Sequence, residues 1–215
     1  MSSLIFYTDA EQIYVATDTL AVELDGTPMM FSSKAIYLPH LRTIIAGTGM
    51  GMFSGDWAMF VNNQMVLAGI RNLDRQTPNA LRFRWQQYQA EYSLRASLTT
   101  TVYHFGFSEE DESVRAFAYR STNNFESEVI AHGFGLKPTC TPPTEGILVE
   151  ALPAMMFEQR ANERAKPADE RLYIGGECIG IHLTKTGCNI SRVFQFNDHP
   201  QHLQAIFRNH RANAG

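Results

Sequence analysis

Ser2 is the residue of this chain with the clearest potential for covalent chemistry, because it directly follows the first methionine. An initiator methionine is normally trimmed when a small residue comes next, so we expect Ser2 to carry a free α-amino group. A serine hydroxyl is a good nucleophile only when a base takes its proton. An α-amine, with a reference pKa of about 7.7–8.0, can serve as that base near neutral pH. The predicted reaction is hydrolysis of an amide or peptide bond through an acyl-enzyme ester.

Charge and hydropathy argue against several other classes of function. The formal net charge is −4, and no long run of lysine or arginine could follow a phosphate backbone, so no nucleic-acid partner is expected. The first twelve residues lack the basic and apolar stretches of a signal peptide. No segment is apolar for long enough to cross a bilayer. We therefore expect a cytoplasmic protein without a membrane partner.

The cysteines and histidines do not form a recognisable metal or redox motif. The three cysteines cannot all pair within one chain, and their spacing fits neither a CxxC motif nor a zinc ligand set. We interpret them as reduced, half-buried thiols. For the scattered histidines, packing is a better explanation than metal binding. No cofactor is expected from these residues, which are Cys140, Cys178, Cys188, His104, His132 and His182.

The elements that must position Ser2 begin immediately after it. Residues 4–8 and 12–19 are rich in β-branched and aromatic residues and flank a short turn, which predicts two paired strands. Residues 33–38 and 42–47 predict a second pair. Because neither pair is joined by a helical crossover, the sheet is expected to be antiparallel.

The hydrophobic period then changes to that of helices. Apolar residues recur at three- and four-residue steps over residues 52–70, which predicts an amphipathic helix. A second helix is predicted from Pro78 to about Arg95, with Thr77 as its N-cap.

The rest of the chain returns to strands, interrupted by one long helix. Glycine and proline predict a loop over residues 132–144, and Lys185–Thr186–Gly187 is a suitable hairpin turn. The remaining predicted elements are strands at 99–107, 114–120, 125–131, 172–184 and 188–196, and helices at 145–164 and 201–210.

This order of elements predicts the architecture. No linker, repeat or low-complexity tract divides the chain, so residues 1–215 are expected to form a single domain. Helices that arrive in blocks between antiparallel strands are typical of two stacked sheets covered outside by helices. The predicted fold is a four-layer αββα sandwich of the α+β class.

Four short motifs at the N-terminal end share a characteristic spacing. Ser2–Ser3 opens the chain, Ala16–Thr17–Asp18–Thr19 ends the second strand, Lys34 begins the third, and Gly47–Thr48–Gly49–Met50–Gly51 leads into the first helix. Asp18 and Lys34 lie 16 and 32 positions after Ser2. In these motifs the sequence resembles the proteasome β-type subunits and their bacterial relatives, which are N-terminal-nucleophile (Ntn) hydrolases. The likeness extends along nearly the whole chain in element order, and the closing hairpin, which begins near Gly175–Gly176, resembles the family's Gly-Gly strand.

The resemblance implies a role for each of these residues. Ser2 stands where the family has its threonine nucleophile. Lys34 would favour loss of protons from Ser2 through its positive field, and Asp18 would keep Lys34 charged and oriented. The backbone N–H of Gly51, at a helix start, would stabilise the developing oxyanion.

The chain also departs from the family pattern at the positions that support the nucleophile's amino group. The family has a serine in a glycine-rich loop, where this chain has His132–Gly133–Phe134–Gly135. The family has an aspartate and a serine before the Gly-Gly strand, where the nearest counterparts here are Arg171 and Ile174, with Asp169 and Glu170 close by.

Three readings of the function remain open on the sequence alone. The first is a proteasome-like serine hydrolase that assembles into a homo-oligomeric ring and cleaves unfolded peptides or small amides. The second is a non-catalytic assembly or interaction subunit of the same fold, in which Ser2 is vestigial; taken singly, Asp18 could also be a turn former and Lys34 an ordinary surface residue. The third is a small-molecule amidase of the same fold. Methionines on the helices are interpreted as packing faces, and the acidic run at residues 109–112 as a solvated turn.

Overall fold

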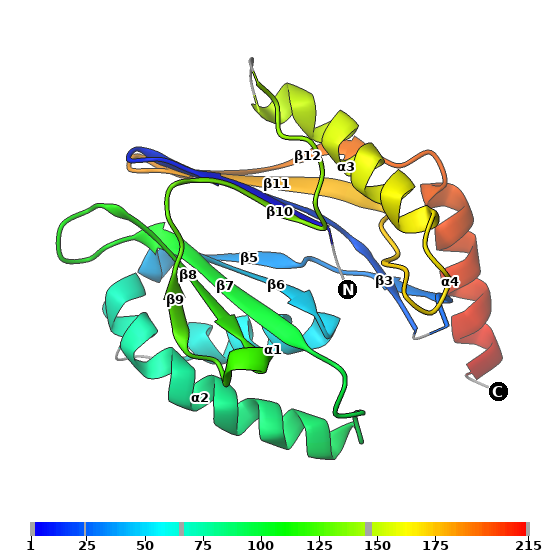
Figure 1. Cartoon of the computed structure of the whole chain (residues 1–215), viewed down its shortest axis with the longest axis horizontal. Helices are drawn as coiled ribbons and strands as arrows, with labels where there is room; N and C mark the ends of the chain where they lie inside the picture. Colours follow the sequence, from blue (N-terminus) through cyan, green and yellow to red (C-terminus); the bar gives the residue numbers. More distant parts are fainter. Residues whose placement is uncertain (1–2, 24, 65–66, 145–147, 214–215) are drawn as a thin grey trace.

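The computed structural model describes residues 3–23, 25–64, 67–144 and 148–213. Two five-stranded antiparallel sheets lie face to face (Figure 1). Helix α3 (Leu148–Arg164) lies outside one of them, and helices α1 (Gly51–Asn62) and α2 (Ile70–Glu91) lie outside the other. The predicted αββα sandwich is therefore confirmed. No helix within the described ranges is long and apolar enough to span a membrane.

Sheet 1 carries the N-terminal strands and has the strand order β10-β1-β2-β11-β12. Side chains alternate between its two faces, as period-2 geometry requires. Leu4 and Phe6 pack into the core between the sheets, whereas Ile5 packs in the cluster beneath α3. The strands are β1 (Leu4–Thr8), β2 (Gln12–Asp18), β10 (Gly133–Lys137), β11 (Glu177–Thr184) and β12 (Cys188–Gln195).

In sheet 2 the strands are neighbours in the same order as in the sequence, β5-β6-β7-β8-β9. Ile44 and Ala46 face sheet 1, and Ile45 between them faces the cluster under α1 and α2. The strands are β5 (Ala35–Leu38), β6 (Thr43–Gly49), β7 (Thr100–Phe107), β8 (Val114–Arg120) and β9 (Ser127–Val129); short 3-10 helices occupy Pro39–Leu41 and Ser121–Asn123.

The boundary between the first two helices differs from the prediction. The helix predicted over 52–70 ends early, because α1 spans Gly51–Asn62, and α2 spans Ile70–Glu91 and runs through Pro78. Thr77 is therefore not an N-cap; its hydroxyl donates to the Leu73 carbonyl inside the helix at 2.8 Å. A proline after a polar residue predicts a helix start, but here the buried apolar face of α2 outweighs that signal.

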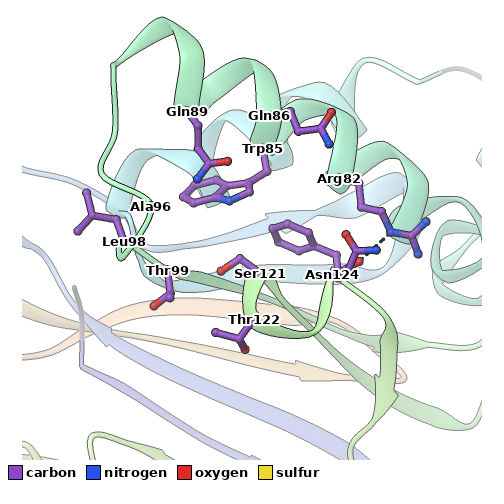
Figure 2. Close-up of a pocket in the computed structure, with 11 residues that line it drawn as sticks. Arg82, Trp85, Gln86, Gln89, Ala96, Leu98, Thr99, Ser121, Thr122 and Asn124 are labelled. Carbon is purple, nitrogen blue, oxygen red and sulfur yellow. Dashed lines mark hydrogen bonds between the residues drawn. The ribbon is translucent and has the colours of Figure 1, made fainter.

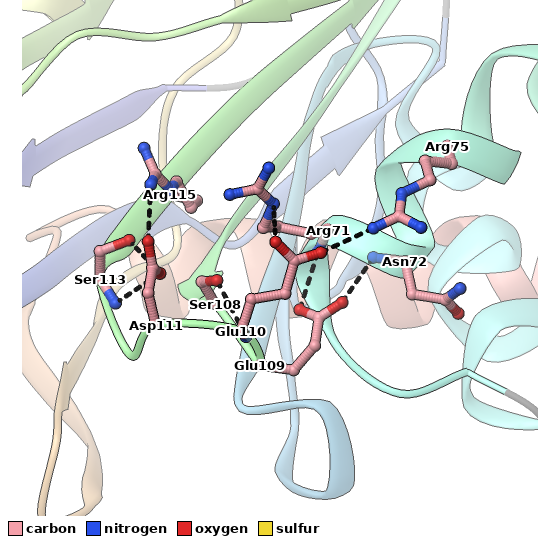
Figure 3. Close-up of polar contacts among 9 residues, drawn as sticks. All are labelled: Arg71, Asn72, Arg75, Ser108, Glu109, Glu110, Asp111, Ser113 and Arg115. Carbon is pink, nitrogen blue, oxygen red and sulfur yellow. Dashed lines mark hydrogen bonds and ion pairs between the residues drawn. The ribbon is translucent and has the colours of Figure 1, made fainter.

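The N-terminus of α2 is capped by a carboxylate from another part of the chain. Glu109, in the turn between β7 and β8, accepts backbone N–H bonds from Arg71 at 3.0 Å and Asn72 at 2.7 Å (Figure 3). Partial burial alone would raise the pKa of Glu109, but backbone hydrogen bonds, including these two, lower it overall. Glu110 adds ion pairs to Arg71 and Arg75. Residues 109–112 are an exposed turn, as expected, and two of them also hold the start of α2.

The remaining elements include three differences from the sequence-based expectations. The loop predicted over 132–144 contains β10; Gly135 is needed there because a Cβ atom would lie 1.9 Å from the Phe6 ring. A small sheet of β3 (Leu20–Val22) and β4 (Pro28–Phe31) was not predicted. The strand predicted from residue 172 begins at Glu177. The last helices are α3 (Leu148–Arg164) and α4 (His199–Asn213), and the first three residues predicted for α3, 145–147, lie outside the described ranges.

Candidate functional site

A buried ion pair joins Asp18 at the end of β2 to Lys34 just before β5. Lys34 Nζ lies 2.8 Å from Asp18 Oδ1, and the two side chains are 6% and 0% exposed. Lys34 Nζ also donates to the backbone carbonyl of Leu20 at 2.6 Å. The structure thus brings together two of the residues singled out from the sequence, and gives the buried ammonium two oxygen partners. It rules out the reading of Lys34 as an ordinary surface residue.

Asp18 also holds the beginning of the chain. Its Oδ1 accepts the backbone N–H of Ser3 at 2.9 Å, and its Oδ2 accepts the backbone N–H of Gly175 at 3.1 Å. One carboxylate is therefore hydrogen-bonded to the N-terminal segment, to Lys34 and to the Gly175–Gly176 segment. Ser2 lies outside the described residues, so the structure describes the site from Ser3 onward.

The glycine turn that leads to Gly51 lies against Lys34. The Gly47 N–H donates to the Lys34 carbonyl at 3.3 Å, and Gly51 is the first residue of α1. Gly49 has φ +95°, and a Cβ atom there would lie 2.2 Å from the Thr99 carbonyl oxygen. Only glycine suits that combination of backbone and space. The first N–H groups of a helix lack intrahelical partners, so the start of α1 can bind an oxyanion.

The segment before Gly175 supplies no carboxylate or hydroxyl to the described part of the site. Arg171 donates to the carbonyls of Arg164 and Lys166, Ile174 is buried, and Asp169 and Glu170 are exposed. Arg171 and Ile174 therefore do not replace the aspartate and serine that the family has before its Gly-Gly strand.

His132–Gly135, matched from the sequence to the family's glycine-rich loop near the nucleophile, lies at the far end of β10 from Ser3. β10 pairs antiparallel with β1, so Gly133 lies opposite Thr8, whereas Lys137 lies opposite Leu4 next to Ser3. Four residues of strand separate the two ends by about 13 Å. The segment beside Ser3 is therefore the one after Lys137, and not His132–Gly135.

Sequence reasoning missed Gln159, which is fully buried on α3. Its side chain accepts the Ser3 hydroxyl at 2.5 Å and donates to the Pro138 carbonyl at 2.5 Å. A signal was present, since a glutamine close to the buried Met155 and Met156 breaks the apolar face of the helix.

Two hollows in the described surface lie away from this site. One of about 330 Å³, between α2 and the adjoining ends of β7 and β8, is lined by Trp85, Thr99, Ser121 and their neighbours (Figure 2). A second, of about 380 Å³, lies between α1 and α2. Neither is lined by Asp18 or Lys34. The candidate site is therefore defined by the Asp18–Lys34 ion pair and its hydrogen bonds, and not by a pocket.

The cysteines and His104 offer no competing reactive centre. Burial raises the pKa of Cys140 to about 11 and that of Cys178 to about 12, which leaves them protonated and weakly nucleophilic at neutral pH. Complete burial lowers the pKa of His104 to about 3, and its Nε2 accepts the Trp57 indole N–H at 2.8 Å. In the part of the chain that is described, no three His, Cys, Asp or Glu side chains are grouped to hold a metal ion.

Comparisons with solved structures give relatives of the same fold, whereas comparisons of the sequence give none. No protein-family model matches the sequence, and no curated protein does. Among solved structures, the chain is similar to Anbu (ancestral beta-subunit) from Yersinia bercovieri, with a TM-score of 0.60 and 10% sequence identity over 99% of this chain and 94% of that one. At this identity the likeness establishes the fold alone. The chain therefore has a proteasome-like β-subunit fold.

Proposed function

We propose that the protein is a proteasome-like N-terminal serine hydrolase, with residues 1–215 acting as one domain and Ser2 as the nucleophile. The observation that carries this proposal is the buried Asp18–Lys34 pair whose carboxylate binds the N–H of Ser3, the residue bonded to Ser2. A charged pair in a core is costly to bury, and apolar packing could replace it if the fold alone mattered. Its attachment to the N-terminal segment supports a chemical role.

The reaction follows from the groups at hand. The Ser2 α-amine takes the proton of the Ser2 hydroxyl as the oxygen attacks the substrate carbonyl. The Lys34 ammonium stabilises the negative charge that develops on the attacking oxygen, and Asp18 fixes the ammonium in place. The Gly51 N–H donates to the oxyanion. The amine then protonates the leaving nitrogen, and a water molecule hydrolyses the resulting ester and restores the free Ser2 hydroxyl.

A covalent probe tests this proposal directly. Protein whose intact mass shows loss of Met1 is expected to react with a peptide epoxyketone, which captures both the hydroxyl and the α-amine of an N-terminal residue. Peptide mass mapping should place the adduct on Ser2. Ser2→Ala should abolish labelling, because no other group supplies the oxygen, and its unfolding temperature should stay at the wild-type value. Ser2→Thr keeps the hydroxyl and is expected to label.

The non-catalytic subunit is the second candidate, and a specific observation favours it. Arg171 and Ile174 occupy the places of supporting polar groups, and Arg171 is bonded to the end of α3 instead. Processed protein with Ser2 first that never labels, even at high reagent concentration and long exposure, would establish this candidate and exclude the hydrolase.

We also propose that the protein associates with copies of itself through the outer faces of α1 and α2. Met52, Met59 and Phe83 on these helices are each more than half exposed, and apolar side chains grouped on one face often mark an interface. Sedimentation velocity at micromolar concentration is expected to give multiples of 24.2 kDa. Met59→Glu should shift the distribution towards the monomer, whereas Ile190→Glu, at an exposed position on β12 of sheet 1, should not. A wild-type monomer would contradict the proposal.

A further inference from the structure

The α3 helix buries three polar side chains where apolar ones would pack as well. Gln159, Arg160 and Glu163 are 0%, 9% and 1% exposed. A buried polar group destabilises the fold unless it is hydrogen-bonded, and each of these three reaches a different distant segment. Arg160 binds Asp198 before α4, Glu163 binds the N–H of Leu172, and Gln159 binds Ser3.

The orientation of the Gln159 amide follows from its partners. The Pro138 carbonyl can only accept, so the amide nitrogen of Gln159 must face it, at 2.5 Å. The amide oxygen then faces Ser3 and accepts from the Ser3 hydroxyl, also at 2.5 Å. The direction of both bonds is therefore fixed.

Ser3 is consequently held at two points. Asp18 accepts its backbone N–H and Gln159 accepts its hydroxyl, and Ser3 is fully buried. The two acceptors come from β2 and α3, two separate layers of the fold. Together they restrain both the backbone and the side-chain rotamer of Ser3.

An N-terminal nucleophile needs such a restraint more than other nucleophiles do. Its base is its own α-amine, and its one covalent tie to the rest of the protein is the peptide bond to the next residue. A displacement of about 1 Å at a reacting atom can cost roughly 100-fold in rate. We propose that Gln159 is a positioning residue that fixes the reactive N-terminus through the Ser3 hydroxyl; the inference rests on the function proposed above.

Gln159→Met tests the role with little change of volume. Two measurements are made on the full chain: exchange of the Ser3 amide proton by NMR, and the rate of epoxyketone labelling against reagent concentration. We expect Ser3 exchange to rise roughly tenfold or more, because the anchor is lost. The maximal labelling rate should fall roughly 10- to 100-fold, whereas the half-saturating reagent concentration should stay unchanged, since Gln159 does not contact the reagent.

Two further variants separate positioning from loss of stability. Ser3→Ala removes the other end of the bond and should reproduce both effects, and the double variant should be no worse than either single one. Tyr119→Phe is the matched control: Tyr119 is buried in the cluster under α1 and α2, and the variant removes one part-buried hydrogen bond, from its phenol to Asp74. It should leave Ser3 exchange and labelling at wild-type values.

The outcomes distinguish this inference from the proposed function. Unchanged Ser3 exchange in folded Gln159→Met and Ser3→Ala would overturn the positioning role. So would faster exchange combined with a wild-type maximal labelling rate. If the wild-type protein never labels, the hydrolase proposal and the catalytic purpose of the anchor both fail, while the exchange measurement still decides whether Gln159 holds the N-terminus.

Discussion

Asp18→Ala is expected to lower the free energy of unfolding by about 3–5 kcal/mol, because it leaves a buried charge without its partner. Lys34, with a side chain 6% exposed, would keep only the Leu20 carbonyl, and the N–H groups of Ser3 and Gly175 would lose their acceptor. For a chain of this length the midpoint of thermal unfolding should fall by roughly 6–20 °C. Calorimetry measures the change, and epoxyketone labelling should disappear in the same variant.

Two comparisons make this result specific. Asp169→Ala removes an exposed aspartate and should leave stability within about 0.5 kcal/mol of wild type. Replacing both members of the pair, as Asp18→Leu with Lys34→Met, removes the unpaired charge and should regain part of the stability while labelling stays absent. An unfolding midpoint for Asp18→Ala within 2 °C of wild type, where roughly 6–20 °C is expected, would mean that the pair does not hold this end of the fold together.

The strands nearest the site could be predicted because they are local. Residues 4–8 and 12–18 form a hairpin whose paired residues, from Thr8–Ile13 to Leu4–Thr17, are 5 to 13 positions apart in the chain. The alternation of apolar residues fixes which side faces the core. The resemblance of the Ser2, Asp18 and Lys34 motifs to those of the proteasome β-type subunits then implied a charged pair at one end of that hairpin. The fold class followed from the same order of strands and helices.

The errors arose where distant parts of the chain decide the structure. β10 carries two glycines and reads as a loop, but it becomes a strand because β1 offers it a free edge. The start of α2 is set by Glu109, nearly forty residues further on, and not by a capping residue of its own. Gln159 lies 156 positions from Ser3, and no local pattern links the two.

Gly49→Ala is expected to disable the turn that delivers Gly51 to the start of α1. The alanine would have to adopt φ +95°, and its Cβ atom would lie 2.2 Å from the Thr99 carbonyl oxygen, which is backbone and cannot swing aside. The left-handed backbone costs an L-residue about 1–2 kcal/mol, and overpacking costs about 1–3 kcal/mol more. The clash can be relieved only if the turn moves. The Met50 N–H donates to that same Thr99 carbonyl at 3.1 Å, so it would move with the turn.

The effect on labelling should exceed the effect on stability. Loss of one oxyanion donor typically costs 100- to 1,000-fold in rate, so a displaced Gly51 N–H should bring epoxyketone labelling close to the limit of detection. Gly55→Ala is the matched control, because Gly55 lies within α1 and a Cβ atom there would meet nothing within 4 Å. That variant should gain about 0.5–1 kcal/mol from its better helix propensity and label at the wild-type rate. If Gly49→Ala labels as fast as Gly55→Ala, the oxyanion is not bound at the start of α1, and the donor must be sought elsewhere around Lys34.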